Sequence, residues 1–234
     1  MSEQPVVPDV AAPAGRGPLL EVVGLAAYVR LGLFGIIGQH TWDAPDLASS
    51  QRMLAIGLRV GEQQGRLLAI GASHGVEPVE LMRPFAGVLD SFEARTPESS
   101  WWEGLLKGVV GHGVASDLCR LLARGLPGDL AAQVVGAMEY TDDDERATSI
   151  VRAGVEADGR LGSRLALWGR RVVGESLSLS QALLTTRPSF GELARAAMPA
   201  TVAPEGPSAD VVAWVLGELT AEHTRRMDRM GLAA

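Results

Sequence analysis

Residues 19–40 read LLEVVGLAAYVRLGLFGIIGQH, and residues 46–74 read DLASSQRMLAIGLRVGEQQGRLLAIGASH. Each stretch predicts one long helix, because apolar residues recur through it without a break. Residues 43–46 form a turn, and Asp46 is a residue type that caps a helix N-terminus. Gly75, with Pro78 just beyond it, marks the end of the second helix. Since the turn is short, the two helices should lie antiparallel, as in a helical bundle.

The rest of the chain continues this pattern. No strand pattern with a period of two residues occurs, so the predicted fold class is all-α. Residues 1–18 are rich in proline and glycine and predict a disordered tail, which leaves 19–234 as one helical domain. Residues 199–207 read as a linker. The further helices are expected over 78–95, 101–124, 129–157, 160–186, a short segment to 197, and 208–230.

The composition limits the classes of function. Of 234 residues, 47% are hydrophobic and only 5% aromatic, so the core is built from Leu, Val and Ala. The net charge of −7 and the absence of a long basic run argue against nucleic-acid binding. One cysteine, Cys119, excludes an internal disulfide. We expect a cytoplasmic protein, because neither a signal peptide nor an apolar run long enough to span a membrane is apparent.

Several blocks of sequence are distinctive and keep their register over long stretches. They resemble an actinobacterial family of ferritin-like proteins related to tRNA isopentenyl-adenosine hydroxylases. The resemblance runs from Leu19 to the C-terminus and implies a ferritin-like four-helix bundle with additional peripheral helices. In such a bundle, carboxylates and histidines on facing helices project inward to hold two metal ions. The blocks are Ser100–Lys107, Gly111–Asp117, Arg164–Arg171, Gly174–Ser178 and Leu219–Met227.

At the ligand positions that this resemblance implies, most residues are of the wrong type. The first helix has Arg30 in place of a Glu, and the second has Val60 and Gln63 in place of a Glu-x-x-His pair. An arginine among the ligands would repel metal ions. We therefore interpret the di-iron ligands as largely lost, with no metal cofactor and less than one iron per purified chain. The polar residues that remain at or near such positions are His112, Asp117, Asp143 and Glu175.

Glycine is unusually frequent for a helical protein, with 28 residues. Gly57, Gly61 and Gly65 are spaced by four and share one helix face. This stripe indicates either a close approach between helices or a cavity beside them. We predict an apolar pocket for a small apolar or partly polar organic ligand. Its expected lining residues are Tyr28, Gly57, Val60, Gly61, Gln63, Gln64, Asp117 and Trp168.

Four residues are candidates for catalysis and are expected to converge inside the bundle: Arg30, His112, Asp143 and Glu175. Arg30 would either neutralise a buried acid or hold a ligand oxygen, and His112 is the natural acid–base group. The leading hypothesis is a metal-independent, non-redox enzyme of the cyclase, isomerase or lyase type, acting in specialised metabolism.

Three alternatives stay open. One is a non-catalytic binding or scaffold protein, and another is a residual metal-dependent hydroxylase. The acidic run at residues 142–145 leaves open a site for magnesium diphosphate, although such runs are more often solvated. A homodimer is possible in any of these cases.

Overall fold

The computed structural model describes residues 17–139, 143–199 and 209–234, with the side chains of 143–145 and 209–210 also left out. Within this part of the chain all regular structure is helical. Five long helices dominate, and six short ones connect or cover them. The long ones are α1 (Pro18–Trp42), α2 (Leu47–Ser73), α5 (Trp101–Arg124), α8 (Gly159–Thr186) and α10 (Ala209–Arg229).

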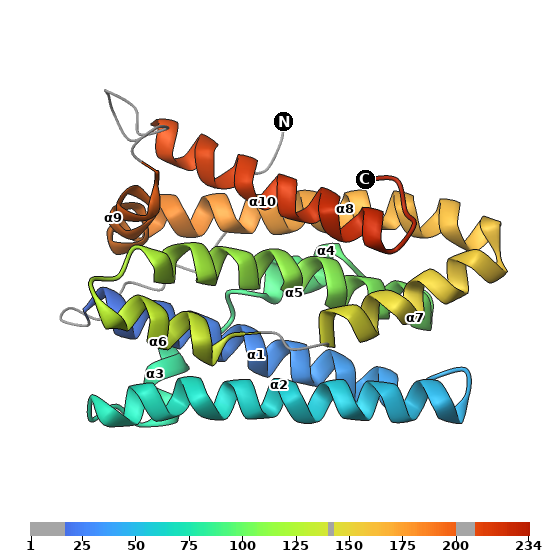
Figure 1. The fold of residues 1–234 in the computed structure, drawn as a ribbon, viewed down its shortest axis with the longest axis horizontal. Helices are drawn as coiled ribbons and strands as arrows, with labels where there is room; N and C mark the ends of the chain where they lie inside the picture. The colour runs from blue at the N-terminus through green and yellow to red at the C-terminus, as the bar shows by residue number, and fades with distance from the viewer. Residues whose placement is uncertain (1–16, 140–142, 200–208) are drawn as a thin grey trace.

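The long helices form layers around a central element, α5. The α1–α2 hairpin lies on one side of α5, and α8 with α10 lies on the other (Figure 1). α5 contacts α1, α8 and α10, so nearly every residue from Glu103 to Val114 is buried. The predicted all-α ferritin-like bundle is therefore confirmed.

Local signals in the sequence set the helix ends. The side chain of Asp46 accepts a hydrogen bond from Ser49 N at 2.7 Å, as an N-cap residue should. Ser100 caps α5 in the same way by accepting from Glu103 N. Gly75 follows α2 with a φ of +73°, a conformation that glycine adopts without strain.

Two expected helices are each divided. The segment 78–95 contains α3 (Pro78–Met82), the 3₁₀ turn η1 (Arg83–Phe85) and α4 (Asp90–Arg95), because Gly87 has a φ of +81° and ends the helical path. The segment 129–157 contains α6 (Asp129–Ala137) and α7 (Asp143–Ala157). A final short helix, α9 (Pro188–Ala197), follows α8. The predicted tail at 1–18, apart from its last two residues, lies outside the described residues, as does most of the predicted linker at 199–207.

α1 corrects one expectation from the sequence. By length and composition it could cross a membrane, but 56% of its most apolar window is buried inside the bundle. Arg30 also lies in the middle of this helix and is buried. These facts are typical of a core helix in a globular bundle.

Candidate functional site

A buried polar cluster lies at the centre of the bundle, between α1 and α5. Arg30 is only 1% exposed, and its Nη1 donates a hydrogen bond to Ser116 Oγ at 2.7 Å. Ser116 Oγ in turn donates to the carbonyl oxygen of His112, one turn earlier on α5, at 2.6 Å. The cluster thus joins two helices that are 86 residues apart in the sequence at this contact.

This cluster falls at the junction of two apolar cores. Val29 belongs to the core that also includes α9 and α10, and Leu33 belongs to the core beneath α2 and α7. On α5, Val114 belongs to the first of these cores and Val110 to the second. Arg30 and His112 therefore interrupt what would otherwise be one continuous apolar interior.

His112 is held neutral by its surroundings. Its ring is 2% exposed, and burial, followed by the neighbouring Arg30 charge, lowers its pKa to about 4. The main chain of Val29 lies close enough to favour the protonated ring, but without good hydrogen-bond geometry to either ring nitrogen. Gly32 makes room for the ring, because a Cβ there would lie 3.1 Å from His112 Cε1. At neutral pH this imidazole is an uncharged, buried base.

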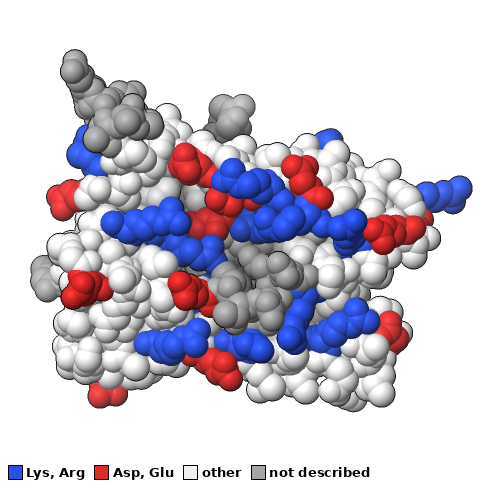
Figure 2. All heavy atoms as spheres, viewed as in Figure 1, with Lys and Arg blue, Asp and Glu red and all other residues white. Residues whose placement is uncertain are grey.

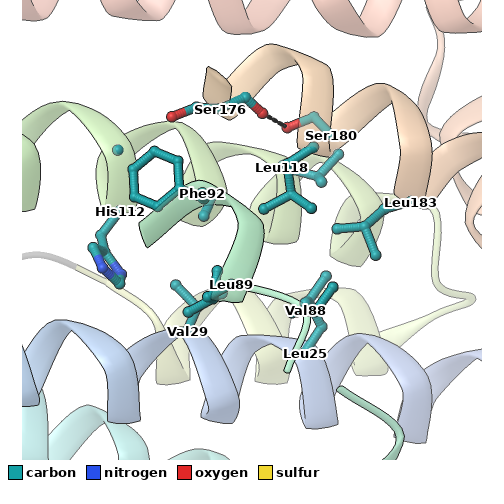
Figure 3. A pocket seen from close by; sticks show the side chains of 13 residues that line it. Leu25, Val29, Val88, Leu89, Phe92, His112, Leu118, Ser176, Ser180 and Leu183 are labelled. Carbon is teal, nitrogen blue, oxygen red and sulfur yellow. Dashed lines mark hydrogen bonds between the residues drawn. The ribbon is translucent and has the colours of Figure 1, made fainter. Parts of the chain in front are cut away.

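An apolar void adjoins His112. Figure 3 shows the imidazole at one end of it, directed toward α1. Ser176 and Ser180 also face the void, but their hydroxyls donate to carbonyls of their own helix, at 2.8 Å each. The void measures about 20 Å³, which is room for one water molecule. Its other lining side chains include Leu25, Val29, Val88, Leu89, Phe92, Leu118 and Leu183.

A second void lies where the sequence predicts a ligand pocket, between α1, α2 and α5. Val60 and Gln63 line it, together with Leu33 and Ile37 from α1. Gln63 Nε2 donates to Glu139 O at 3.2 Å, while its Oε1 has no hydrogen-bond partner among the described residues. The void measures about 40 Å³, enough for two or three waters. Organic ligands occupy far larger pockets, of about 300–1,000 Å³.

The glycines of α2 do not hollow out this void. A Cβ on Gly57 would lie 3.2 Å from Ile37 Cγ2, so this glycine serves the close approach of α1 and α2. Gly61 and Gly65 face open space on the outside of the hairpin. Gly61 follows the buried Val60, and Gly65 follows the half-buried Gln64. One residue step rotates a helix position by about 100°, so both glycines point away from the core. The expectation that Gly61 lines an interior pocket was wrong.

Four other predicted pocket residues take part in separate contacts. Tyr28 Oη accepts from Gly87 N at 3.0 Å, and Gln64 Nε2 donates to Ala27 O at 3.5 Å. Trp168 Nε1 donates to Glu103 O at 3.0 Å. Asp117 pairs with Arg120 at 2.7 Å and with Arg226 at 2.6 Å. None of these four side chains lines either interior void.

Of the four candidate catalytic residues, the structure brings two together. Arg30 and His112 are neighbours in the interior. Glu175 instead pairs with Arg95 of α4 at 3.4 Å, on the partly exposed edge of α8. It precedes the inward-facing Ser176, and one helical step rotates it out of the core. Asp143 begins α7, but its side chain lies outside the described residues, as do those of the acidic run 142–145.

The sequence reasoning missed a second buried charge. Lys107 on α5 is 1% exposed and pairs with Glu93 and, at 3.0 Å, with Glu98. His40 lies 3.8 Å from the same Glu98, and burial lowers its pKa. A lysine inside the apolar run 104–110, next to an acidic loop, was the available signal. This cluster ties the α4 region to α5 and is structural.

A polar hollow of about 140 Å³ lies between α5 and α10 at the surface. Asp117, Arg120, Arg124, Glu218 and Glu222 line it. Figure 2 shows this face of the molecule, where basic and acidic side chains are interleaved. Such mixing favours internal ion pairs over a single-sign surface.

The described residues do not fit a metal centre. No group of three His, Cys, Asp or Glu side chains that could hold an ion occurs among them. Cys119 is buried, and burial raises the pKa of its thiol to about 12, so it is no thiolate ligand. The cation Arg30 stands at the centre instead.

The arrangement of the helices and the buried core between them are those of an all-α ferritin-like protein. A family model described as "Ferritin-like domain, actinomycetes" matches residues 16–196. The chain belongs to this family. The match ends in α9, so α10, which covers α5 and α8, lies beyond it. A comparison with curated proteins gives no match.

Proposed function

We propose that this chain is a non-catalytic ferritin-like protein that works as a binding or scaffold protein. The observation that carries the proposal is Arg30, a fully buried guanidinium bonded to Ser116 at 2.7 Å, where the resemblance implies a metal-binding carboxylate. A fixed cation at this point opposes metal binding. The same cation joins α1 to α5, so the former ligand position now serves the folded state.

The size of the interior supports this proposal. The voids beside His112 and beneath α2 have room for one and for two or three waters. A substrate would need the helices to separate, which would expose the two apolar cores around Arg30. Neither of these two voids between the described helices has room for a substrate, which favours binding at the surface over chemistry in the interior.

One observation favours a second candidate, a metal-independent non-redox enzyme. His112 is an uncharged base beside a cation, and neither of its ring nitrogens has a hydrogen-bond partner among the described residues. In an opened pocket, His112 would take a proton and Arg30 would stabilise the resulting negative charge. A cyclisation, isomerisation or elimination of a small organic compound would fit this pair.

The test combines metal analysis with a ligand screen on the purified full-length chain. The scaffold proposal expects less than one iron, manganese or zinc per chain, and no small molecule whose stabilising effect depends on His112. Thermal melts of wild type and His112→Ala against a library of small apolar compounds give the second readout. A compound that raises the melting temperature of wild type but not of His112→Ala would show a ligand site at His112, and conversion of that compound by wild type but not by His112→Ala would establish the enzyme candidate. Stoichiometric iron would establish the relation to metal-dependent hydroxylases.

A further inference from the structure

One stripe of the outer surface of the α1–α2 hairpin, near the turn, carries mostly apolar side chains. Leu31, Phe34 and Trp42 on α1 are between 45% and 90% exposed. Leu47, Leu54 and Leu58 on α2 fall in the same range. Of the eight large hydrophobic side chains that are exposed in the described part of the chain, these are six. We call this surface the hairpin face.

These residues form one continuous stripe. On α1, positions 31, 35, 38 and 42 recur every three or four residues, and on α2 positions 47, 51, 54, 58, 61 and 65 do the same. Phe34 bridges the two helices, because its ring lies 3.9 Å from where a Cβ of Gly57 would be. No position in either series carries a charge.

Four glycines stand within the hairpin face: Gly35, Gly38, Gly61 and Gly65. A Cβ built on any of them meets no atom within 4 Å. Glycine inside a helix costs about 1 kcal/mol relative to alanine, and nothing within the chain requires it here. Single glycines of this kind also occur on α6, α8 and α10, at Gly136, Gly174 and Gly217. The hairpin face differs in gathering four of them beside six exposed large side chains.

We propose that the hairpin face binds the hairpin face of a second copy of this chain, forming a two-fold symmetric dimer. On α2 the large side chains at 47, 54 and 58 lie toward the turn, and the glycines at 61 and 65 lie away from it. Two copies in antiparallel orientation can therefore set the protruding part of one stripe over the glycine part of the other. A two-fold interface needs such self-complementarity, because the same patch serves both subunits.

The area of the face suits a stable dimer. Taking about 200 Å² for each aromatic side chain and roughly 120 Å² for each leucine, the exposed parts of the six amount to about 550 Å², close to the apolar share of a standard interface. A standard protein interface buries about 800 Å² on each partner. The largest apolar patch on a typical monomer is about 300–600 Å².

A second copy fits better than a lipid surface. Helices that lie on membranes flank their apolar face with lysine and arginine, which the anionic headgroups attract. α1 carries no exposed lysine or arginine, since Arg30 is buried. On α2 the charged residues outside the stripe are of both signs, Glu62 among the arginines at 52, 59 and 66, and Arg66 Nε donates to Ala137 O at 3.3 Å. The chain as a whole carries a net charge of −7, which anionic headgroups would repel.

The experiment measures the molar mass of the full-length chain between 1 and 100 µM by light scattering and sedimentation. Wild type should be a dimer at 10 µM. Leu58→Glu places a charge in the interface and should raise the dissociation constant at least 100-fold, giving monomers. The matched control is Leu167→Glu on α8, because Leu167 is 67% exposed and Leu58 is 61% exposed. This control should remain a dimer.

Circular dichroism spectra of both variants should equal that of wild type, since neither side chain is buried. Trp42→Ser at the tip of the face provides a second, milder variant, expected to weaken the dimer at least tenfold. A monomeric wild type at 100 µM would overturn the proposal, and so would a Leu58→Glu dimer. Binding of wild type, but not Leu58→Glu, to phosphatidylcholine vesicles would show that the face is a membrane contact instead.

Discussion

Glycines occur on both the inner and the outer side of the α1–α2 hairpin, but they have different roles on the two sides. On the inner side, a Cβ on Gly24 would lie 2.4 Å from the Leu81 carbonyl oxygen, and one on Gly32 would lie 3.1 Å from the His112 ring. These glycines are explained by what the chain packs against them. On the outer side, Gly35, Gly38 and Gly61 face open space. Nothing among the described residues offsets their cost in helix stability, and the proposed dimer would offset it.

The largest effect is expected on the inner side, at Arg30. Arg30→Ala should lower the free energy of unfolding by about 3 kcal/mol, because it leaves a cavity between α1 and α5 and removes the hydrogen bond to Ser116. Urea unfolding followed by circular dichroism measures this loss. The control is Arg170→Ala, an exposed arginine on α8, with an expected change below about 0.5 kcal/mol. Equal stability of the two variants would mean that Arg30 serves a ligand and not the fold.

A pH dependence is expected next, from His112. Its pKa in the folded state, about 4, lies below the unfolded value of 6.5, so the unfolded chain binds the proton more tightly. Stability is therefore complete above pH 6.5 and falls as the pH drops toward 4. Between pH 7.5 and pH 5.0 this one group should remove roughly 2 kcal/mol.

The measurement is urea unfolding at both pH values for wild type and His112→Leu. Between pH 7.5 and pH 5.0, His112→Leu should lose roughly 2 kcal/mol less stability than wild type, whatever its stability at pH 7.5. His74→Gln, at an exposed histidine, should behave like wild type. A wild-type slope in His112→Leu would place the pH sensitivity at other groups, with His40 and His223 as candidates since burial lowers both of their pKa values.

The sequence predicted the fold more completely than it predicted the candidate site. The cap at Asp46 and the glycine at 75 predicted the two ends of α2 correctly. The division of 78–95 was missed, although Pro84 and Gly87 were visible signals. The break before α7 was also missed, although the polar run TDDDER at 141–146 interrupts the apolar pattern there.

In the site, Arg30 and His112 were placed in the interior correctly, since each interrupts an apolar helix. Glu175 was not, because the motif fixes its position in the sequence but not the rotation of α8 against its neighbours. The volume of a void depends on how side chains from four helices interlock, and no pattern along one helix contains that information. Of the eight residues expected to line a pocket, Val60 and Gln63 line the void beneath α2, and that void lacks the room that a ligand needs.

A smaller effect is expected from an inner glycine. Gly24→Ala should destabilise the fold by about 2 kcal/mol, because the methyl group would meet a main-chain carbonyl of α3 that cannot rotate away. Gly35→Ala, eleven residues later on the same helix, is the matched control at nanomolar concentration, where the proposed dimer is dissociated, and its methyl group meets no atom within 4 Å. Thermal or urea unfolding of both variants should give opposite signs. Equal destabilisation would show that α1 is distorted by alanine regardless of its surroundings.

The smallest effect is expected at Gly61. It tests the difference between the inner and outer sides of the hairpin most directly. Gly61→Ala should stabilise the dissociated subunit by about 1 kcal/mol, because alanine favours the helix and the added methyl meets nothing. In a dimer through the hairpin face, the same methyl group stands between two closely packed helices and weakens association. Unfolding is followed by tryptophan fluorescence. At nanomolar protein concentration, Gly61→Ala should have a higher unfolding midpoint than wild type. As the protein concentration rises, the midpoint of Gly61→Ala should increase less than that of wild type. Gly174→Ala on α8, another glycine in open space, supplies the helix effect alone and should keep the full concentration dependence. If Gly61→Ala and Gly174→Ala behave alike at all concentrations, the outer glycines have no partner to accommodate, and the contrast between the two sides of the hairpin is one of helix propensity only.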